Sequence, residues 1–248
     1  MILSDFFDGF GRQAVSIIGC GGKTSLMWAL AARSCNCKTL VTTTTHTQRP
    51  DSAAGRFDYF IDEATARGDF SPSAGICFAG SVKSERSVSA LPPDVLEALI
   101  PLFDRIFIEA DGSRSRPLKA WAPYEPVITE SSAITVGILP LWPLGNRVSD
   151  ALVHRLPLFT ALTGASTGDI ILPEHYVSVI AGLPAGGAHS LFGIARGKKI
   201  LFFNQIEDGR GLENARKITA MLPPDFLSGL SAVIAGSVLL NRAESVSH

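Results

Sequence analysis

Residues 14–25 read AVSIIGCGGKTS, and this stretch decides the fold. Its first six residues are rich in Ala, Val and Ile and lack regular polar alternation, which is typical of a strand buried on both faces of a parallel sheet. Three glycines lie within residues 19–22, at the end of this run, and a helical pattern begins at Lys23. Phosphate-binding loops occur in this context of strand, glycine-rich turn and helix.

The glycine-rich turn has the composition of a polyphosphate site. Glycine has no Cβ, so the backbone amides around Gly21 and Gly22 can approach an anion closely. The amides at the start of the following helix carry partial positive charge and suit a phosphate. We expect Lys23 to reach the outer phosphates and the Thr24 hydroxyl to ligate Mg²⁺. The alternative is a plain strand-to-helix turn with an incidental lysine. The predicted nucleotide-binding residues here are Gly19, Gly21, Gly22, Lys23, Thr24 and Ser25.

The spacing of this turn departs from the signature G-x-x-x-x-G-K-[ST], because its first glycine would fall at Ile17. The shorter form at residues 19–24, G-x-x-G-K-T, resembles the phosphate loop of the Mur ligases and folylpolyglutamate synthetases. That resemblance implies a Mur-like ATP-dependent ligase as one alternative. Those enzymes carry additional substrate domains, which a chain of 248 residues is not expected to hold.

Further apolar runs and helical stretches alternate along the chain, which predicts an α/β fold: a phosphate-loop domain with a mostly parallel sheet flanked by helices on both faces. We treat residues 1–248 as one nucleotide-binding domain, with a smaller C-terminal lobe over about 183–248 as the alternative. The other predicted strands are 39–44, 76–80, 105–110, 133–139 and 199–204. The predicted helices are 23–34, 93–102, 150–162, 173–181 and 212–222.

A run of threonines closes the second predicted strand, where residues 39–46 read TLVTTTTH. Ligands of open parallel sheets lie beyond the carboxyl ends of the strands. Hydroxyls there can hold a metal or its waters, and we take Thr44 as the metal ligand, although the pattern does not decide among the four threonines. The alternative is the β-propensity of threonine. His46 is expected either to contact substrate or metal, or to cap the next segment.

An acidic strand end follows at residues 103–116, FDRIFIEADGSRSR. Glu109 and Asp111 are two positions apart and so share one side of a strand. We predict that Glu109 ligates Mg²⁺ or a water, that Asp111 helps to place substrate, and that both act in catalysis with Lys23. Asp111 is alternatively a turn residue bonded to its own backbone. A buried acid here requires a nearby cation.

Basic residues come directly after this acidic strand end. Arg114, Arg116 and Lys119 form a local cationic cluster in the sequence. Such a cluster is suited to a second anionic ligand or to transition-state oxygens. A solvated basic loop is the equal alternative.

Taken together, GCGGKTS, VTTTTH, EADGSRSRPLKA and EPVI resemble the YqeC-type selenium-dependent hydroxylase accessory proteins in order and spacing. The resemblance covers most of residues 14–130 and continues more loosely to the C-terminus. It implies a Mg²⁺-dependent protein that binds and hydrolyses ATP or GTP during maturation of selenium-dependent molybdenum hydroxylases. Its partner would be such a hydroxylase or its cofactor. The alternative is a nucleotide-gated chaperone without significant turnover of its own.

Near the C-terminus, ILFFNQIED at residues 200–208 resembles the strand-end N-K-x-D signature of phosphate-loop GTPases. Asn204 is accordingly predicted to bind nucleotide. Gln205 stands in place of Lys and Glu207 in place of Asp, so the choice between ATP and GTP stays open. A polar strand end followed by an acidic helix start is the other interpretation.

Composition limits the classes of function. Lys and Arg number 22 against 23 for Asp and Glu, which argues against a general nucleic-acid binder. No apolar run approaches the ~20 residues that cross a bilayer, and the N-terminus lacks the pattern of a signal peptide. We therefore expect a cytoplasmic protein with no membrane partner.

The four cysteines, of which Cys35 and Cys37 form a C-x-C pair, are expected to be reduced thiols. Cys20 lies within the phosphate loop, where a helix start lowers the pKa of a thiol. A role for Cys20 in holding selenium or sulfur is one hypothesis. The alternative is a loop residue chosen for its size.

Overall fold

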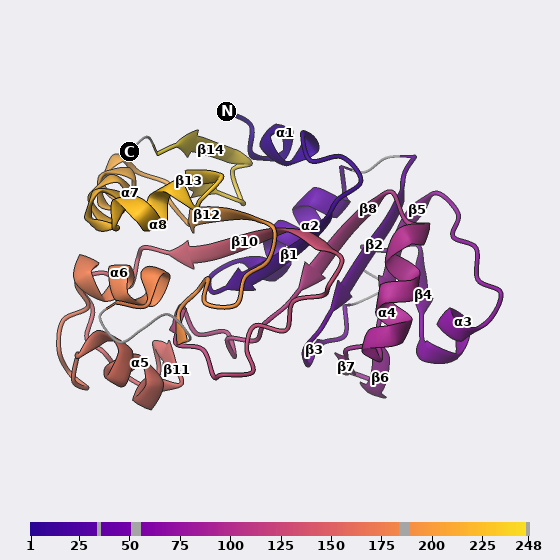
Figure 1. Ribbon diagram of the computed structural model, residues 1–248, viewed down its shortest axis with the longest axis horizontal. Helices are drawn as coiled ribbons and strands as arrows, with labels where there is room; N and C mark the ends of the chain where they lie inside the picture. The colour runs from indigo at the N-terminus through magenta and orange to yellow at the C-terminus, as the bar shows by residue number, and fades with distance from the viewer. Residues whose placement is uncertain (34–35, 51–55, 184–188, 247–248) are drawn as a thin grey trace.

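The computed structural model describes residues 1–33, 36–50, 56–183 and 189–246. Its centre is a nine-stranded sheet in the order β14-β13-β12-β10-β1-β8-β2-β5-β4 (Figure 1). Every neighbouring pair is parallel except β13 and β14. The strands are β1 Ala14–Gly19, β2 Lys38–Thr43, β4 Tyr59–Ile61, β5 Gly75–Ala79, β8 Arg105–Glu109, β10 Ser132–Pro140, β12 Lys198–Asn204, β13 Ala232–Ser237 and β14 Arg242–Ser245.

Helices cover both faces of the sheet, as predicted. Successive strand residues point to opposite faces, so Ile200 and Phe202 pack in the cluster with α1 and α2, while Leu201 and Phe203 pack in the cluster with α5 to α8. A third cluster joins α4 to β2, β5 and β8. The helices are α1 Leu3–Asp8, α2 Lys23–Ala31, α3 Glu63–Arg67, α4 Pro93–Leu99, η2 Ile100–Leu102, α5 Leu156–Thr163, α6 Pro173–Ala181, α7 Gly209–Met221 and α8 Pro224–Ser228.

Two small sheets stand apart from the main one. β3 (Thr47–Gln48), β6 (Ser81–Ser84) and β7 (Ser87–Ser89) form an antiparallel sheet, and β9 (Leu118–Lys119) pairs with β11 (Val153–His154). In the first, β3 follows the end of β2, and β6 and β7 follow the end of β5; in the second, β9 follows β8 and β11 follows β10. Both therefore lie in connections that leave the carboxyl edge of the main sheet, where ligands of open α/β folds bind.

The prediction of one helix over 150–162 is wrong in its first half, because residues 153–154 form β11 and the helix begins only at Leu156. Arg155 has a φ of 61°, which interrupts any helix, and Pro157 follows in the first helical turn. The helix predicted from 212 begins three residues earlier, since Asp208 caps it by accepting a hydrogen bond from the Gly211 amide. Ser34, the predicted end of α2, and Cys35 lie outside the described residues.

None of the helices in the described ranges has the length and apolar character needed to cross a membrane.

Candidate functional site

The phosphate loop joins β1 to α2, and its glycines are required by backbone geometry. Gly19, Gly21 and Gly22 have φ values of 100°, 71° and 124°, which side-chain-bearing residues rarely adopt. Neighbouring atoms also leave no room for a side chain. A Cβ at Gly19 would lie 2.2 Å from the Ile138 carbonyl oxygen, and one at Gly22 would lie 2.3 Å from Asn204 Nδ2. The loop is therefore fitted tightly against β10 and β12.

Backbone donors are gathered at the start of α2. In the described part of the chain, none of the amides from Gly21 through Ser25 donates to an acceptor, and the helix has no side-chain N-cap. Unpaired amides at a helix start, together with the helix dipole, form an anion-binding site. The loop thus has the donors that a polyphosphate requires.

Lys23 lies beneath this loop with only 5% of its surface exposed. Its Nζ donates to the Gly19 carbonyl at 2.6 Å and stands 3.3 Å from Asp111 Oδ1. Burial alone would lower the pKa of Lys23, but the carboxylates of Asp111 and Glu109 outweigh it and raise the pKa. Lys23 is therefore held as a cation at the floor of the loop.

Asp111 does not face substrate, which corrects its predicted role. It is fully buried, and its carboxylate accepts from the Gly19 amide at 3.0–3.1 Å and from Trp121 Nε1 at 2.7 Å. Lys23 and Lys119 Nζ each lie 3.3 Å from its oxygens. Burial alone would raise the pKa of Asp111, but the two lysines and these hydrogen bonds outweigh it and lower the pKa. Asp111 is a positioning residue that holds the loop and its lysine.

Lys119 belongs to this buried network and not to a basic surface cluster. Its ammonium donates to the Gly112 carbonyl at 2.7 Å and lies 3.4 Å from Glu125 Oε2. Glu125 in turn accepts two hydrogen bonds from the Arg155 guanidinium, at 2.9 and 3.0 Å. A chain of alternating charges therefore runs from the phosphate loop through Asp111 to Arg155.

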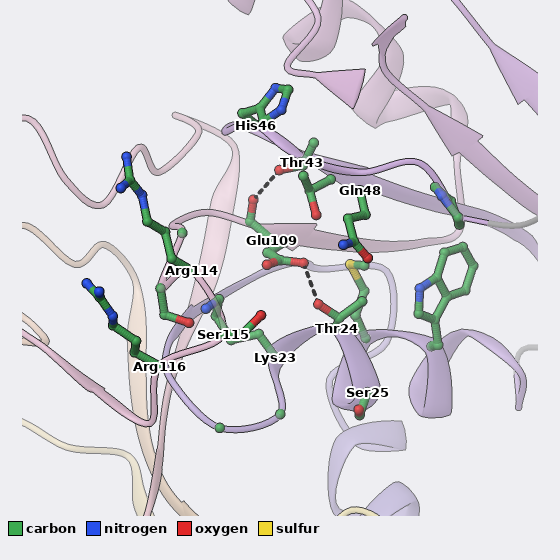
Figure 2. A pocket seen from close by; sticks show the side chains of 18 of the residues that line it. Lys23, Thr24, Ser25, Thr43, His46, Gln48, Glu109, Arg114, Ser115 and Arg116 are labelled. Atoms are coloured by element: carbon green, nitrogen blue, oxygen red, sulfur yellow. Dashed lines mark hydrogen bonds between the residues drawn. The ribbon is translucent and has the colours of Figure 1, made fainter. Parts of the chain in front are cut away.

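Glu109 is the predicted acid that faces the loop. The Thr24 hydroxyl donates to Glu109 Oε2 at 2.9 Å, and the Thr43 hydroxyl donates to the Glu109 backbone carbonyl at 3.0 Å (Figure 2). Thr44 instead donates to the Val127 carbonyl at 2.6 Å, and the residue of this run that lies beside Glu109 in register is Thr43. The hydroxyl of Thr44, the predicted metal ligand, is thus engaged with Val127, and the threonine that lies beside Glu109 and lines the cavity described below is Thr43.

The Thr24–Glu109 pair fits a bound magnesium ion. No group of three or more His, Cys, Asp or Glu side chains forms a metal cage in the described ranges. Mg²⁺ does not need one, since it binds one or two carboxylates together with substrate phosphates and water. Glu109 is 8% exposed, and burial raises its pKa against the opposing effects of Lys23 and Thr24. A buried carboxylate of this kind would be stabilised by a cation between it and the loop.

We expect Glu109→Gln to raise the melting temperature of the ligand-free protein at pH 7 by roughly 2–4 °C. The raised pKa means that the folded state disfavours the ionised carboxylate, so wild type loses stability above the ordinary pKa of a glutamate. Below about pH 4 the side chain is protonated in both states and the difference should vanish. Calorimetric scans at pH 7 and pH 4 test this. The same change at exposed Glu213 is the control, and a lower melting temperature at pH 7 would contradict the expectation.

Asn204 fixes the loop from the other side and does not line the cavity described below. Its Nδ2 donates to the Gly21 carbonyl at 2.7 Å, and its Oδ1 accepts from the Val238 amide at 3.0 Å. The residue that lines the cavity at this strand end is Gln205, with a φ of 60°. The sequence signature identified the correct strand end, but the structure gives Asn204 a positioning role.

A cavity of about 1040 Å³ opens over the phosphate loop (Figure 2). It is lined by Lys23, Thr24 and Ser25, by Thr42 and Thr43 at the end of β2, and by the loop at 112–117. In that loop Arg114 and Ser115 have φ values of 50° and 59°, a strained arrangement that is common at functional sites. Among the described residues, the Lys, Arg, Asp and Glu side chains that line the cavity comprise five cations and one acid. They are Lys23, Arg49, Arg56, Arg114, Arg116 and Glu109. A chain of net charge −1 thus concentrates positive charge at one place.

Of the predicted cationic cluster, Arg114 and Arg116 line the cavity beside the phosphate loop, and Arg116 is also held by Asp150 at 2.6 Å. Arg49, Arg56 and Gln48 were not predicted. They follow no motif, and only the folding of the chain after β2 brings them to the cavity.

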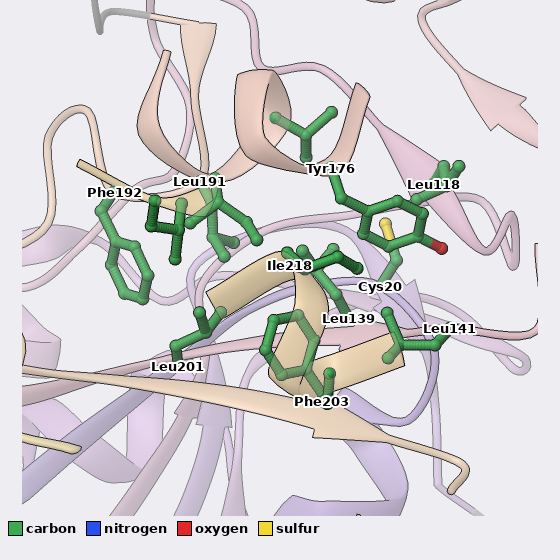
Figure 3. Packing of buried hydrophobic residues seen from close by; sticks show 14 of the residues in the cluster. Cys20, Leu118, Leu139, Leu141, Tyr176, Leu191, Phe192, Leu201, Phe203 and Ile218 are labelled. Atoms are coloured by element: carbon green, nitrogen blue, oxygen red, sulfur yellow. The ribbon is translucent and has the colours of Figure 1, made fainter. Parts of the chain in front are cut away.

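Cys20 is not a reactive thiol. It is fully buried and packs with Tyr176 and Leu141 in the apolar cluster behind the loop (Figure 3). Burial raises the pKa of the Cys20 thiol to about 12, so the thiol stays protonated. The hypothesis of a lowered pKa is wrong. The other described cysteines, Cys37 and Cys77, are free, and Cys35 lies outside the described residues.

Comparison with known proteins identifies the family of this chain. A family model described as YqeC protein matches residues 15–157, which include all of β1 but its first residue, the phosphate loop and Glu109. The Uncharacterized protein YqeC of Escherichia coli (strain K12) is 30% identical over 233 residues, which cover 90% of this chain and 87% of that protein. No solved structure matches the chain.

Proposed function

This chain belongs to the YqeC family, and from that premise we propose that it is a Mg²⁺-dependent protein that binds and hydrolyses ATP or GTP. Its proposed role is that of an accessory protein in the maturation of selenium-dependent molybdenum hydroxylases. The observation that carries nucleotide binding is the set of unpaired backbone amides from Gly21 through Ser25 above a buried, protonated Lys23. Family membership supports the accessory role.

The proposed chemistry rests on placement and electrostatics. The amides of the loop would bind the β- and γ-phosphates, and the Lys23 ammonium would neutralise charge that develops on them. Thr24 and Glu109 would hold Mg²⁺, which supplies charge neutralisation on the phosphates. Glu109 would also orient an attacking water, because its carboxylate lies at the wall between the loop and the open cavity.

A nucleotide-gated binding module is the second candidate, and one observation favours it. The Thr24 hydroxyl bonds to Glu109 within the protein. Nucleotide binding would exchange this internal bond for bonds of both groups to the metal, which gives the loop two states. Single-turnover hydrolysis measured with and without a target hydroxylase distinguishes the two candidates. Turnover that needs the hydroxylase favours gating, whereas equal turnover favours an autonomous hydrolase.

Isothermal titration calorimetry with ATP and GTP tests nucleotide binding directly. We expect one or both to bind with a dissociation constant in the micromolar range, about −8 kcal/mol, and to bind at least tenfold more weakly when EDTA removes Mg²⁺. AMP serves as the control, since it lacks the phosphates that the loop would hold. Absence of binding by both triphosphates in the presence of Mg²⁺ would refute the proposal.

A further inference from the structure

The cavity extends well beyond the phosphate loop. Its lining runs from Gln205, after β12, to Phe78 in β5. These strands are five positions apart in the order β12-β10-β1-β8-β2-β5, or roughly 24 Å at the usual spacing between strands. Lys23 and the loop follow β1 and therefore lie within this span, with room for ligand on each side.

The two sides differ in chemistry. Toward β12 the lining includes the half-exposed Trp142 and the Gln205 amide, which suit an uncharged nucleoside. Toward β5 it includes the side chains of Trp28 and Phe78, with Arg49 and Arg56 at the rim. We call this second side the β5 arm and define it by these four residues.

The floor of the β5 arm is aromatic and rigid. Trp28 follows Lys23 by five residues on α2, so it lies about 7.5 Å further along the helix axis. Its ring packs against those of Phe57 and Phe78, with centroids 6.5 and 6.0 Å away. Trp28 is 8% exposed and Phe78 is 1% exposed, so the packed rings are held in place and the small open surface of the floor belongs mainly to Trp28. Such a floor favours a flat ligand.

The rim of the arm is cationic. Arg49 and Arg56 are exposed, and neither forms an ion pair with any carboxylate in the described ranges. Arg49 is oriented by the Phe60 ring, which its guanidinium covers at 5.1 Å. Guanidinium groups bind carboxylates and phosphates in a bidentate manner. An anionic group on the ligand would satisfy both arginines.

The position of Glu109 separates the arm from the phosphate loop. Glu109 ends β8, which lies between β1 and β2 in the sheet. Figure 2 shows its carboxylate between Thr24 and Thr43, with Gln48 on one side and Arg114 and Arg116 on the other. A ligand in the β5 arm would therefore face the bound phosphates across Glu109.

We propose that the β5 arm binds a second ligand, a flat aromatic compound that carries a phosphate or carboxylate group. Its place opposite the nucleotide rests on the function proposed above, whereas the arm itself rests on its own aromatic floor and on two arginines that have no ion-pair partner among the described residues. The anion would bind Arg49 and Arg56, and the ring would pack against the exposed part of Trp28. This ligand is the compound on which the protein acts or which it hands over.

Phenyl phosphate and benzoate are the probes, with inorganic phosphate and benzyl alcohol as controls that carry only one of the two features. Each is titrated by calorimetry into the whole protein, once alone and once in the presence of saturating Mg²⁺ and ADP. We expect at least one aromatic anion to bind tenfold or more tightly than either control, with and without ADP. The stronger of phenyl phosphate and benzoate identifies the anionic group.

Arg49→Gln and Arg56→Gln should each weaken the aromatic anion five- to tenfold, and Lys83→Gln, at an exposed position on β6 outside the cavity, should leave its affinity unchanged. Competition between phenyl phosphate and ADP, or wild-type affinity in both arginine variants, would overturn the proposal. If ADP and ATP fail to bind while the aromatic anion binds through the arginines, the proposed nucleotide function is refuted and the proposed ligand site in the β5 arm is supported.

Discussion

Replacing Asp111 with asparagine is expected to lower the free energy of unfolding by about 3–5 kcal/mol. The side chain is fully buried, and its charge lies between the ammonium groups of Lys23 and Lys119. Asparagine would leave these two buried cations without their shared anion. Its NH₂ group would also have to face the Gly19 amide or Trp121 Nε1, both of which are donors.

The effect of Asp111→Asn should depend on pH in a defined direction. Because the pKa of Asp111 is lowered in the folded state, its ionisation stabilises the fold above about pH 4, the ordinary range of an aspartate. That stability is lost as the pH falls through the lower folded pKa. The difference in free energy of unfolding between wild type and variant should therefore be largest at pH 7 and small in strong acid.

Urea unfolding followed by circular dichroism at pH 7 and at pH 3 measures both quantities. Asp150→Asn is the matched control, since Asp150 also pairs with a basic side chain, that of Arg116, but is 74% exposed, and surface pairs of this kind contribute about 0–1 kcal/mol. A loss below 1 kcal/mol for Asp111→Asn would show that Asp111 does not hold the network together.

The sequence was sufficient for the fold because the parallel strands carry a strong local signal. β1 was predicted with its observed bounds, and α6 was too. Apolar runs without alternation have few other interpretations in a chain of this length. The edge of the sheet carries a weaker signal: β13 and β14 were not predicted, although β13 pairs with β12 and extends the sheet.

The site was predicted less well, because it depends on where β8 ends and on how β8 pairs with β2. Glu109 and Asp111 share one side only if the strand continues, but β8 ends at Glu109, and Asp111 turns under the loop. Thr43 is the neighbour of Glu109 because β2 pairs with β8 in a register that the sequence does not encode locally. Lys119 was grouped with a basic cluster, and a reactive Cys20 stood as one hypothesis, because burial was not visible in the motif.

Lys23→Ala is expected to reduce nucleotide hydrolysis about 10²- to 10³-fold, the usual cost of removing a preorganised donor from the charge that develops in the transition state. Lys23 is held for this role before any nucleotide arrives, since the Gly19 carbonyl and the Asp111 carboxylate fix its ammonium beneath the loop. The rate of phosphate release, measured with saturating nucleotide and Mg²⁺, gives the effect. Lys217→Ala, at an exposed position on α7, is the control for loss of a lysine as such.

Loss of structure must be separated from loss of chemistry in this variant, and the network makes the separation feasible. Without Lys23, Asp111 keeps Lys119, the Gly19 amide and Trp121 as partners, so the fold should survive. Lys23→Met, which retains most of the apolar stem without the charge, should then be folded and equally inactive. A folded Lys23→Met variant with wild-type hydrolysis would show that the phosphates lie elsewhere, because no charge at the floor of the loop would then be needed.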